Sequence, residues 1–262
     1  AGNIITVDGV TLRLYYDGGD GNDVVLVAQN GTPSVLYVND QFTSFSMVDG
    51  DAEQAGFQTA YVGVDAFASV ADALAAYPSY AGVIIVNGGT YATVNLTGGG
   101  DVTLQLVQDL ANSEIDVTFG TLSGDAGDSI VTRFYDVANA NLIVESGSFA
   151  GVISGTGDVS KTTSGTLTFS GANTYTGVTN VNAGTLVAAN DSALGTTASG
   201  TSIASGATLD VQANLGTEAL TSAGGSILTS TGTGTVGGTV ALTANSTIGG
   251  DGTLNLDGVI SG

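Results

Sequence analysis

A four-residue phrase of alternating polar and apolar positions recurs along the chain. Its form is Thr-Leu-x-apolar, in which the two apolar residues stand two positions apart, and it occurs at residues 11–14, 103–106, 166–169, 208–211 and 253–256. Side chains two positions apart lie on the same face of a β-strand. Each phrase therefore predicts a strand with one buried face and one solvent-facing face.

Turn signals separate these strands at short, nearly regular intervals. Glycine-containing turns follow one another every 13 to 22 residues, and two Gly-Thr-Leu copies begin at Gly165 and Gly184. This interval is too short for a strand, a helix and a second strand, and repetition of this kind is typical of a β-solenoid, in which each coil packs on the next. A β-sandwich of short strands is the alternative, because it also places strands at regular spacing.

One segment has the pattern of a helix instead of a strand. Phe67, Val70, Leu74 and Tyr77 fall on one helical face, so we expect a short helix over 66–77. Asp65 is its expected N-cap, and Pro78 follows its end. Such a helix can close the N-terminal end of a solenoid and protect the edge of the first coil.

Two resemblances sharpen this expectation. Residues 165–190, GTLTFSGANTYTGVTNVNAGTLVAAN, closely resemble the autotransporter-associated β-strand repeat of secreted surface proteins, and the likeness extends over about 151–262. Residues 67–78 and 83–91 resemble the opening of right-handed parallel β-helix proteins such as pectin methylesterases. The second resemblance implies a fold and no activity, since we find no counterpart to that family's catalytic Asp pair and Arg.

The expected fold is therefore all-β, a right-handed parallel β-helix with a short capping helix and an N-terminal β-hairpin. Three parts are expected. Residues 1–30 form a hairpin that resembles the closing segment of a preceding repeat, 31–150 form an acidic β-helix part, and 151–262 form the autotransporter-type repeat with an open C-terminal coil.

Composition limits the partners. The 262 residues include 24 acids and 3 bases, so the net charge of −21 repels nucleic acid and anionic lipid headgroups. The chain has no Cys, which excludes disulfides and thiolate metal sites. No apolar run approaches the length of a spanning helix, so we expect no membrane insertion.

A glycine- and aspartate-rich segment supplies the metal candidate. Residues 18–26, GGDGNDVVL, fit a calcium-binding nonapeptide, in which Asp17, Asp20, Asn22 and Asp23 can offer oxygen ligands to Ca²⁺. That mode of binding shares each ion between adjacent coils, and the chain has one copy of the motif. A hairpin loop between two apolar strands accounts for the same glycine- and aspartate-rich sequence without a bound ion.

Catalytic candidates are few. Asp116, Asp136 and Asp158 are spaced so that coils can stack them into a carboxylate ladder, as in a glycosidase, but solvated loop acids fit the spacing equally. The chain has no His for general base catalysis and no Cys nucleophile. We therefore expect no enzyme activity and no required cofactor.

Surface glycans are a further candidate partner, through stacking on Tyr80, Tyr91, Tyr135 and Tyr175, although tyrosines of such coils more often fill the core edge.

The C-terminal residues suggest how such a rod is extended. Residues 257–262 repeat 150–155 in all but the first residue and stop where the earlier copy continues, so we expect an open coil whose Val259, Ile260 and Ser261 contact the next segment or another copy of the chain. These features predict a structural segment of an extracellular fibre, stalk or adhesin on a Gram-negative-type bacterium, extended head to tail. The alternative is a carbohydrate-binding or carbohydrate-active β-helix module.

Overall fold

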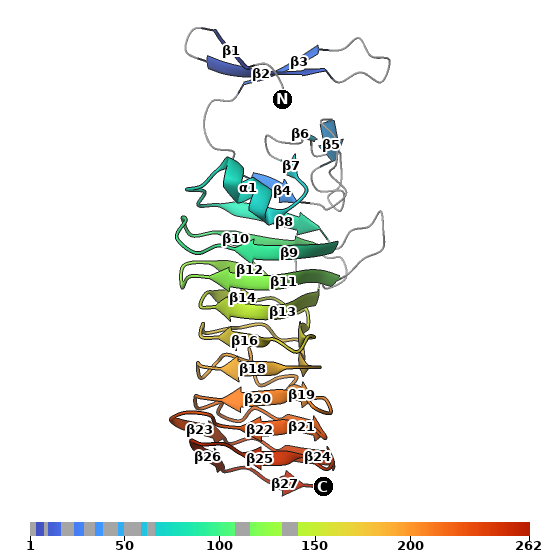
Figure 1. The fold of residues 1–262 in the computed structure, drawn as a ribbon, viewed down its shortest axis with the longest axis vertical. Helices are drawn as coiled ribbons and strands as arrows, with labels where there is room; N and C mark the ends of the chain where they lie inside the picture. The colour runs from blue at the N-terminus through green and yellow to red at the C-terminus, as the bar shows by residue number, and fades with distance from the viewer. Residues whose placement is uncertain are drawn as a thin grey trace.

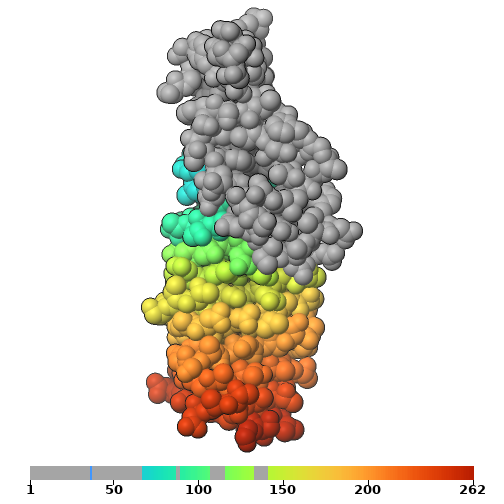
Figure 2. All heavy atoms as spheres, turned by 90° about the vertical axis from the view of Figure 1, so that its right-hand side faces the viewer, coloured from blue at the N-terminus to red at the C-terminus, as the bar shows by residue number. Residues whose placement is uncertain are grey.

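Stacked β-coils dominate the structure. The computed structural model describes residues 4–7, 10–16, 24–28, 35–38, 47–49, 59–61, 66–87, 89–107, 116–132 and 141–262. It is mostly β, with a parallel β-solenoid of about 8 turns, and the coils follow one another along a single axis (Figure 1). Figure 2 shows residues 141–262 as successive layers of one column. The prediction of a β-helix is confirmed, and the antiparallel sandwich is not, because the solenoid strands pair in parallel.

The first face of the solenoid is a six-stranded parallel sheet with the order β14-β12-β10-β8-β4-β7. In register, its inward side chains form a column of Leu36, Ile84, Leu104, Ile130 and Ile153, all fully buried. Its strands are β4 (Val35–Val38), β7 (Ala66–Phe67), β8 (Val83–Asn87), β10 (Thr103–Val107), β12 (Ser129–Val131) and β14 (Val152–Ser154).

The second and third faces share one 14-stranded sheet. In the earlier coils a single long strand covers both faces: β9 (Gly89–Asn95), β11 (Asp116–Gly124) and β13 (Asn141–Phe149). After β13 each coil uses two short strands, and these pairs are β15 (Val159–Lys161) with β16 (Thr166–Phe169), β17 (Thr179–Val181) with β18 (Thr185–Ala188), β19 (Thr201–Ile203) with β20 (Thr208–Val211), β21 (Leu220–Ala223) with β22 (Ser226–Leu228), and β24 (Val240–Ala244) with β25 (Thr247–Gly249).

The two Gly-Thr-Leu copies lie directly above one another. Thr166 pairs with Thr185 and Leu167 with Leu186, so each copy contributes one rung to the same inward column. Gly184 has a φ of +67°, and a Cβ there would lie 2.3 Å from the carbonyl oxygen of Gly165. Glycine is therefore required at this corner by both its backbone angle and the close approach of the coil before it.

Asn173 continues the first face where that sheet has no further strand. The backbone N–H of Ile153 donates to Asn173 Oδ1 (2.8 Å), and Asn173 Nδ2 donates to the carbonyl of Ala193 (2.6 Å). The side chain, which is 2% exposed, thus takes the place of a backbone rung between two neighbouring coils. Buried backbone groups that would otherwise lack partners are satisfied in this way.

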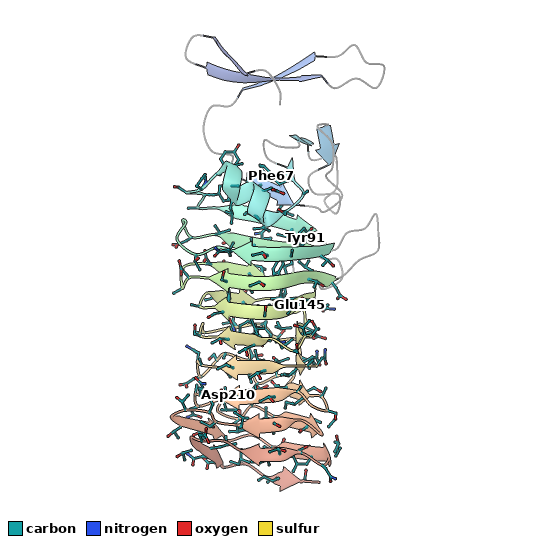
Figure 3. All side chains as sticks on the ribbon, viewed as in Figure 1. Phe67, Tyr91, Glu145 and Asp210 are labelled. Atoms are coloured by element: carbon teal, nitrogen blue, oxygen red, sulfur yellow. The ribbon has the colours of Figure 1, made fainter. Side chains whose placement is uncertain are left out.

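The predicted helix is present but shorter than expected. Helix α1 spans Val70–Ala76, and residues 66–67 belong to β7. Ser69 is its N-cap, because its hydroxyl accepts the Asp72 N–H (3.1 Å) and satisfies one of the free donors of the first turn; Asp65, the expected cap, lies outside the described residues. The helix lies over the N-terminal end of the described coil stack, where Phe67 sits beside it (Figures 1 and 3).

Three small sheets complete the described chain. The expected hairpin is confirmed as the antiparallel pair of β2 (Val10–Tyr16) and β3 (Val24–Ala28), to which β1 (Ile4–Val7) adds a third strand. Strands β5 (Met47–Asp49) and β6 (Thr59–Tyr61) pair antiparallel. Near the C-terminus, β23 (Thr233–Val236) and β26 (Thr253–Leu256) pair in parallel, and β27 (Ile260–Ser261) pairs with β24.

Candidate functional site

The C-terminal coil carries the exposed end of the apolar core. Two inward columns end in it: Ile248 is the rung after Ile227, and Ile260 is the rung after Val240. Ile227 and Val240 are fully buried, whereas Ile248 is 40% exposed and Ile260 is 49% exposed. The difference arises because each terminal rung is covered on one side only.

The backbone at this end is also open on one side. The N–H of Val240 donates to the carbonyl of Val259 (2.9 Å), which fixes β27 on the coil before it. Among the described strands, β25, β26 and β27 each pair with one neighbour, so their outer edges have backbone groups available for pairing. Of the predicted contact residues, Val259 is 69% exposed, and Ile260 and Ser261 are exposed beside it.

Sequence reasoning missed Ile248 as part of this surface. The sequence could have predicted this position, because Thr247-Ile-Gly249 follows Ser226-Ile-Leu228 after one coil and aligns Ile248 with Ile227. The surface formed by Ile248, Val259, Ile260 and Ser261 is called the end surface below.

The calcium candidate cannot be placed in the structure. Asp17, Asp20, Asn22 and Asp23 lie outside the described residues, and calcium binding there stays a prediction. Within the part of the chain that the structure describes, no three His, Cys, Asp or Glu side chains gather closely enough to hold a metal ion.

The expected ladder of stacked carboxylates contains an asparagine, Asn141, between Asp116 and Asp158. Asp116 is in register with Asn141, and Asn141 Nδ2 donates to Asp116 Oδ1 (2.9 Å). On the other side, Asn141 Oδ1 accepts the backbone N–H of Asp158 (3.1 Å). The two carboxylates are thus separated by an amide and by two coil steps, and Asp136 lies outside the described residues. The hydrogen bonds of the Asn141 amide account for the stacking of these side chains.

Several aspartates join neighbouring coils. Each accepts a backbone N–H from an adjacent coil, and the charge of a carboxylate strengthens such a bond. The pairs of acceptor and donor are Asp125 with Gly98, Asp128 with Val102, Asp158 with Val178, Asp191 with Asn214, and Asp210 with Ser230. Part of the acidic character of the chain is therefore structural.

Lys161 is a polar rung in an apolar column. It stands between Val144 and Val181 in register and is 1% exposed. Its Nζ donates to the carbonyls of Thr163 and Ala183, which belong to corners of two successive coils. Burial lowers the pKa of Lys161, and the nearby Glu145 carboxylate opposes this shift. Sequence reasoning did not predict an inward lysine.

A second polar layer spans the next two coils. Thr179 and Thr201 are consecutive inward rungs; the Thr179 hydroxyl bonds to the Tyr175 hydroxyl (2.6 Å), and Thr201 Oγ1 donates to Glu218 Oε1 (2.8 Å). Glu218 is 2% exposed, and burial raises its pKa, against the opposing effect of the Thr201 bond. Burial likewise raises the pKa of Tyr175.

Three of the four candidate tyrosines belong to the core. Tyr80, Tyr91 and Tyr175 are buried, so their rings are not available for stacking on a sugar, and Tyr135 lies outside the described residues. Tyr80 donates its hydroxyl to the carbonyl of Val83 (2.7 Å), and burial raises its pKa to about 12.

Comparison with known proteins adds one match. Residues 159–188 match the family model described as the passenger-associated transport repeat. These residues cover β15 to β18, that is, the two-strand unit of two successive coils. No curated protein and no solved structure matches the chain.

The match agrees with the resemblance found in the sequence and with the stacked coils. A passenger-associated repeat suggests a surface or extracellular protein. In the described part of the chain, no helix has the length and hydrophobicity needed to cross a bilayer. The match and the parallel solenoid together support an autotransporter passenger-type β-helix repeat at residues 159–188.

Proposed function

We propose that the chain is a non-enzymatic structural segment of an extracellular fibre, stalk or adhesin on the surface of a Gram-negative-type bacterium. The segment extends axially, with the end surface covered by a further β-helical coil from a copy of the chain or from an adjacent repeat. The observation that carries the proposal is the continuation of two buried columns into the exposed Ile248 and Ile260.

Physical arguments support axial association over lateral association. Covering exposed apolar side chains contributes about 25 cal/mol per Å² of apolar area. The open strand edges of the last coil can add backbone hydrogen bonds to the coil that covers them. The net charge of −21 makes the sides of two rods repel one another. A contact of this kind does not close on itself, so repeated addition gives a filament.

The proposal is tested by the length of the particles. Electron microscopy and analytical ultracentrifugation of the purified chain should show rods that lengthen with protein concentration. Replacement of both end residues, Ile248→Lys and Ile260→Lys, should abolish lengthening, while the exposed side position Thr221→Lys should not. Particles of one length at every concentration would contradict axial stacking. Release of reducing sugar from a panel of polysaccharides would contradict the non-enzymatic assignment.

Calcium is treated separately, because the proposed role requires no cofactor. Ca²⁺ binding by Asp17, Asp20, Asn22 and Asp23 is proposed only as an accessory to assembly. Light scattering with and without a chelator tests it, and an unchanged particle length would remove calcium from assembly.

A further inference from the structure

The two ends of the coil stack differ in how far their apolar core is covered. At the N-terminal end, Leu36 is the first described rung of its column and is fully buried. Helix α1 contacts β4, β7 and β9 there, and its Val70 and Ala73 are fully buried. At the C-terminal end, Ile260 is 49% exposed. The first coils of a second copy therefore have no open core to place on the end surface, so an axial contact needs another element of that copy.

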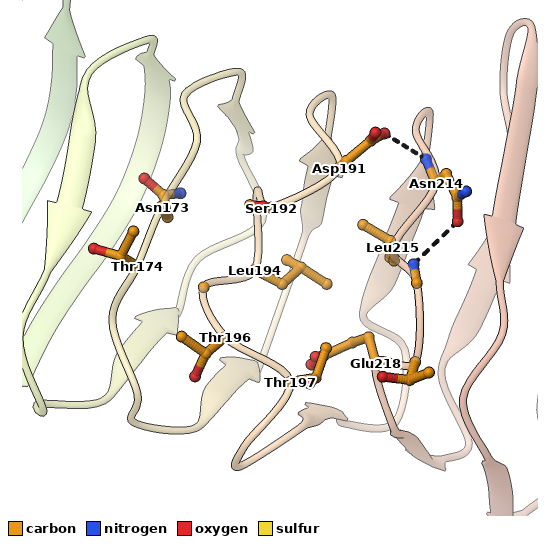
Figure 4. A pocket seen from close by; sticks show the side chains of 13 residues that line it. Asn173, Thr174, Asp191, Ser192, Leu194, Thr196, Thr197, Asn214, Leu215 and Glu218 are labelled. Carbon is orange, nitrogen blue, oxygen red and sulfur yellow. Dashed lines mark hydrogen bonds between the residues drawn. The ribbon is translucent and has the colours of Figure 1, made fainter.

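The side of the rod offers no comparable apolar surface. In the pocket between the β18–β19 and β20–β21 connections, Asp191 accepts the backbone N–H of Asn214, and Leu194 and Leu215 are each 3% exposed (Figure 4). The apolar residues of this pocket thus belong to the core. Among the residues whose burial is described, the exposed large apolar side chains are those of the end surface, namely Ile248, Val259 and Ile260.

A hollow lies beside β27 at the end surface. The register of β27 covers the first two residues of β24, and the other three have no strand partner on this side among the described residues. The hollow has a volume of about 810 Å³ and is lined by residues 242–246 and 260–262. Leu242 and Ser246 are half-buried, and the other lining residues are exposed. Side chains and backbone groups of the last coil are therefore accessible to a partner that brings a strand.

The sheet β1-β2-β3 has one face made of apolar residues only. Its register pairs Ile5 with Leu12 and Leu14 with Leu26, and residues at alternate positions of a strand share a face. The opposite face includes Arg13 and two threonines. A sheet with one apolar face has to bury that face against another element. The nine positions of the apolar face are Ile5, Val7, Val10, Leu12, Leu14, Tyr16, Val24, Leu26 and Ala28.

The position of this sheet indicates its partner. Among the described strands, β1, β2 and β3 pair only with one another. Figure 1 shows them beyond α1, at the end of the molecule opposite to β27. The sheet and the end surface thus lie at opposite ends of one chain, and both have strands with one unpaired edge. A contact between them in two copies is heterologous and does not close, which agrees with axial growth.

The distribution of charge favours the same contact. The net charge of −21 makes most surfaces of two copies repel one another. The nine positions of the apolar face, the end surface and the lining of the hollow include no Asp, Glu, Lys or Arg. These surfaces can therefore meet without bringing side chains of like charge together.

We propose that the apolar face of the β1-β2-β3 sheet of one copy covers the end surface of another copy, and that an edge strand of this sheet lies in the hollow beside β27. This inference rests on the axial association proposed above and names the element of the copy that makes the contact. Covering the exposed apolar side chains stabilises the contact, and the unpaired strand edges add backbone hydrogen bonds.

The test joins two copies through cysteines, because the chain has no Cys of its own. A full-length chain with Leu14→Cys is mixed with one that carries Ile260→Cys, in oxidised glutathione, and the disulfide-linked dimer is followed on non-reducing gels. A disulfide requires the two Cβ atoms to lie about 4 Å apart. We expect this pair to react at least about tenfold faster than Leu14→Cys with the exposed side position Thr221→Cys, since a contact raises the effective concentration of the thiols.

Two control variants separate the faces of the sheet. Arg13→Cys lies on the opposite face of β2 and should react slowly with Ile260→Cys. In electron microscopy, Leu14→Lys should stop the rods from lengthening, whereas Thr11→Lys on the opposite face should not. Circular dichroism melting checks the fold of each variant, and the cysteine pairs decide the matter if Leu14→Lys does not fold.

The outcomes distinguish this contact from axial association in general. Rods that lengthen in the folded Leu14→Lys variant, or equal rates for all three cysteine pairs, would overturn the role of the sheet and leave axial association in place. Unmodified chains that form particles of one length at every concentration would contradict axial association, and this contact with it.

Discussion

The same four residues, Gly-Val-Ile-Ser, occur twice in the chain and have different surroundings. At 151–154 the last three of them form β14, and Ile153 is fully buried between the coil of Ile130 and the coil of Asn173. At 258–261 they end in β27, where Ile260 is covered by Val240 on one side and is 49% exposed. In a solenoid, therefore, burial depends on how many coils flank a residue, and the local sequence does not determine it.

This difference has an energetic consequence. The stability of a repeat structure is approximately a sum of terms within each coil and terms between neighbouring coils. An interior residue such as Ile153 contributes to two interfaces, whereas Ile260 contributes to one. The interior copy should therefore tolerate substitution far less than the terminal copy.

The largest expected effect comes from shortening the two isoleucines. Ile153→Ala removes a fully buried side chain and leaves a cavity, so it should lower the free energy of unfolding by about 2–5 kcal/mol. Ile260→Ala should lower it by less than about 1 kcal/mol, because surface changes usually have small effects. Guanidinium chloride denaturation of both variants measures the difference. Equal losses would show that the terminal rung is as well packed as the interior one.

The Thr-Leu-x-apolar phrase predicted strands correctly, and it predicted their inward sides correctly in the solenoid coils where burial is described. Leu104, Leu167 and Leu209 are all fully or almost fully buried. It did not predict the face on which each strand lies, because residues 103–106, 166–169 and 253–256 fall in three different sheets. The phrase specifies alternation along one strand, whereas the face depends on the lengths of the connecting loops.

Polar residues inside the coils were the hardest to predict. Lys161, Asn173 and Glu218 follow no apolar period, and each is read from sequence as a turn or surface residue. Each is buried because a carbonyl, an N–H or a hydroxyl of a neighbouring coil lies within hydrogen-bonding distance. That partner is 17 to 22 residues away along the chain and is found only when the coils are in register.

A smaller effect is expected from the interior asparagine. Asn173→Asp keeps the acceptor for Ile153 N–H but places an oxygen against the carbonyl of Ala193, so unfolding should require about 1–3 kcal/mol less. The control is Asn255→Asp in the last coil, where the exposed amide makes one long bond to Thr235 (3.5 Å) and little loss is expected. Urea denaturation separates the two, and losses of the same size would contradict the bridging role of Asn173.

The smallest effect is a change in pH dependence at an interior acid. Burial raises the pKa of Glu218 in the folded chain above its ordinary value of 4.5, so the folded state binds more protons than the unfolded state between those two values. The free energy of unfolding should therefore fall as pH rises through this interval, by at most about 1.4 kcal/mol per pH unit. Glu218→Gln keeps an acceptor for Thr201 and removes this slope, which urea denaturation at a series of pH values between about 4 and 8 would detect. Asp257→Asn removes one negative charge from the exposed last coil, so any change shared by both variants reflects net charge alone. If the pH dependence of the free energy of unfolding is unchanged in Glu218→Gln, the pKa of Glu218 is the same in the folded and the unfolded chain, which contradicts the prediction.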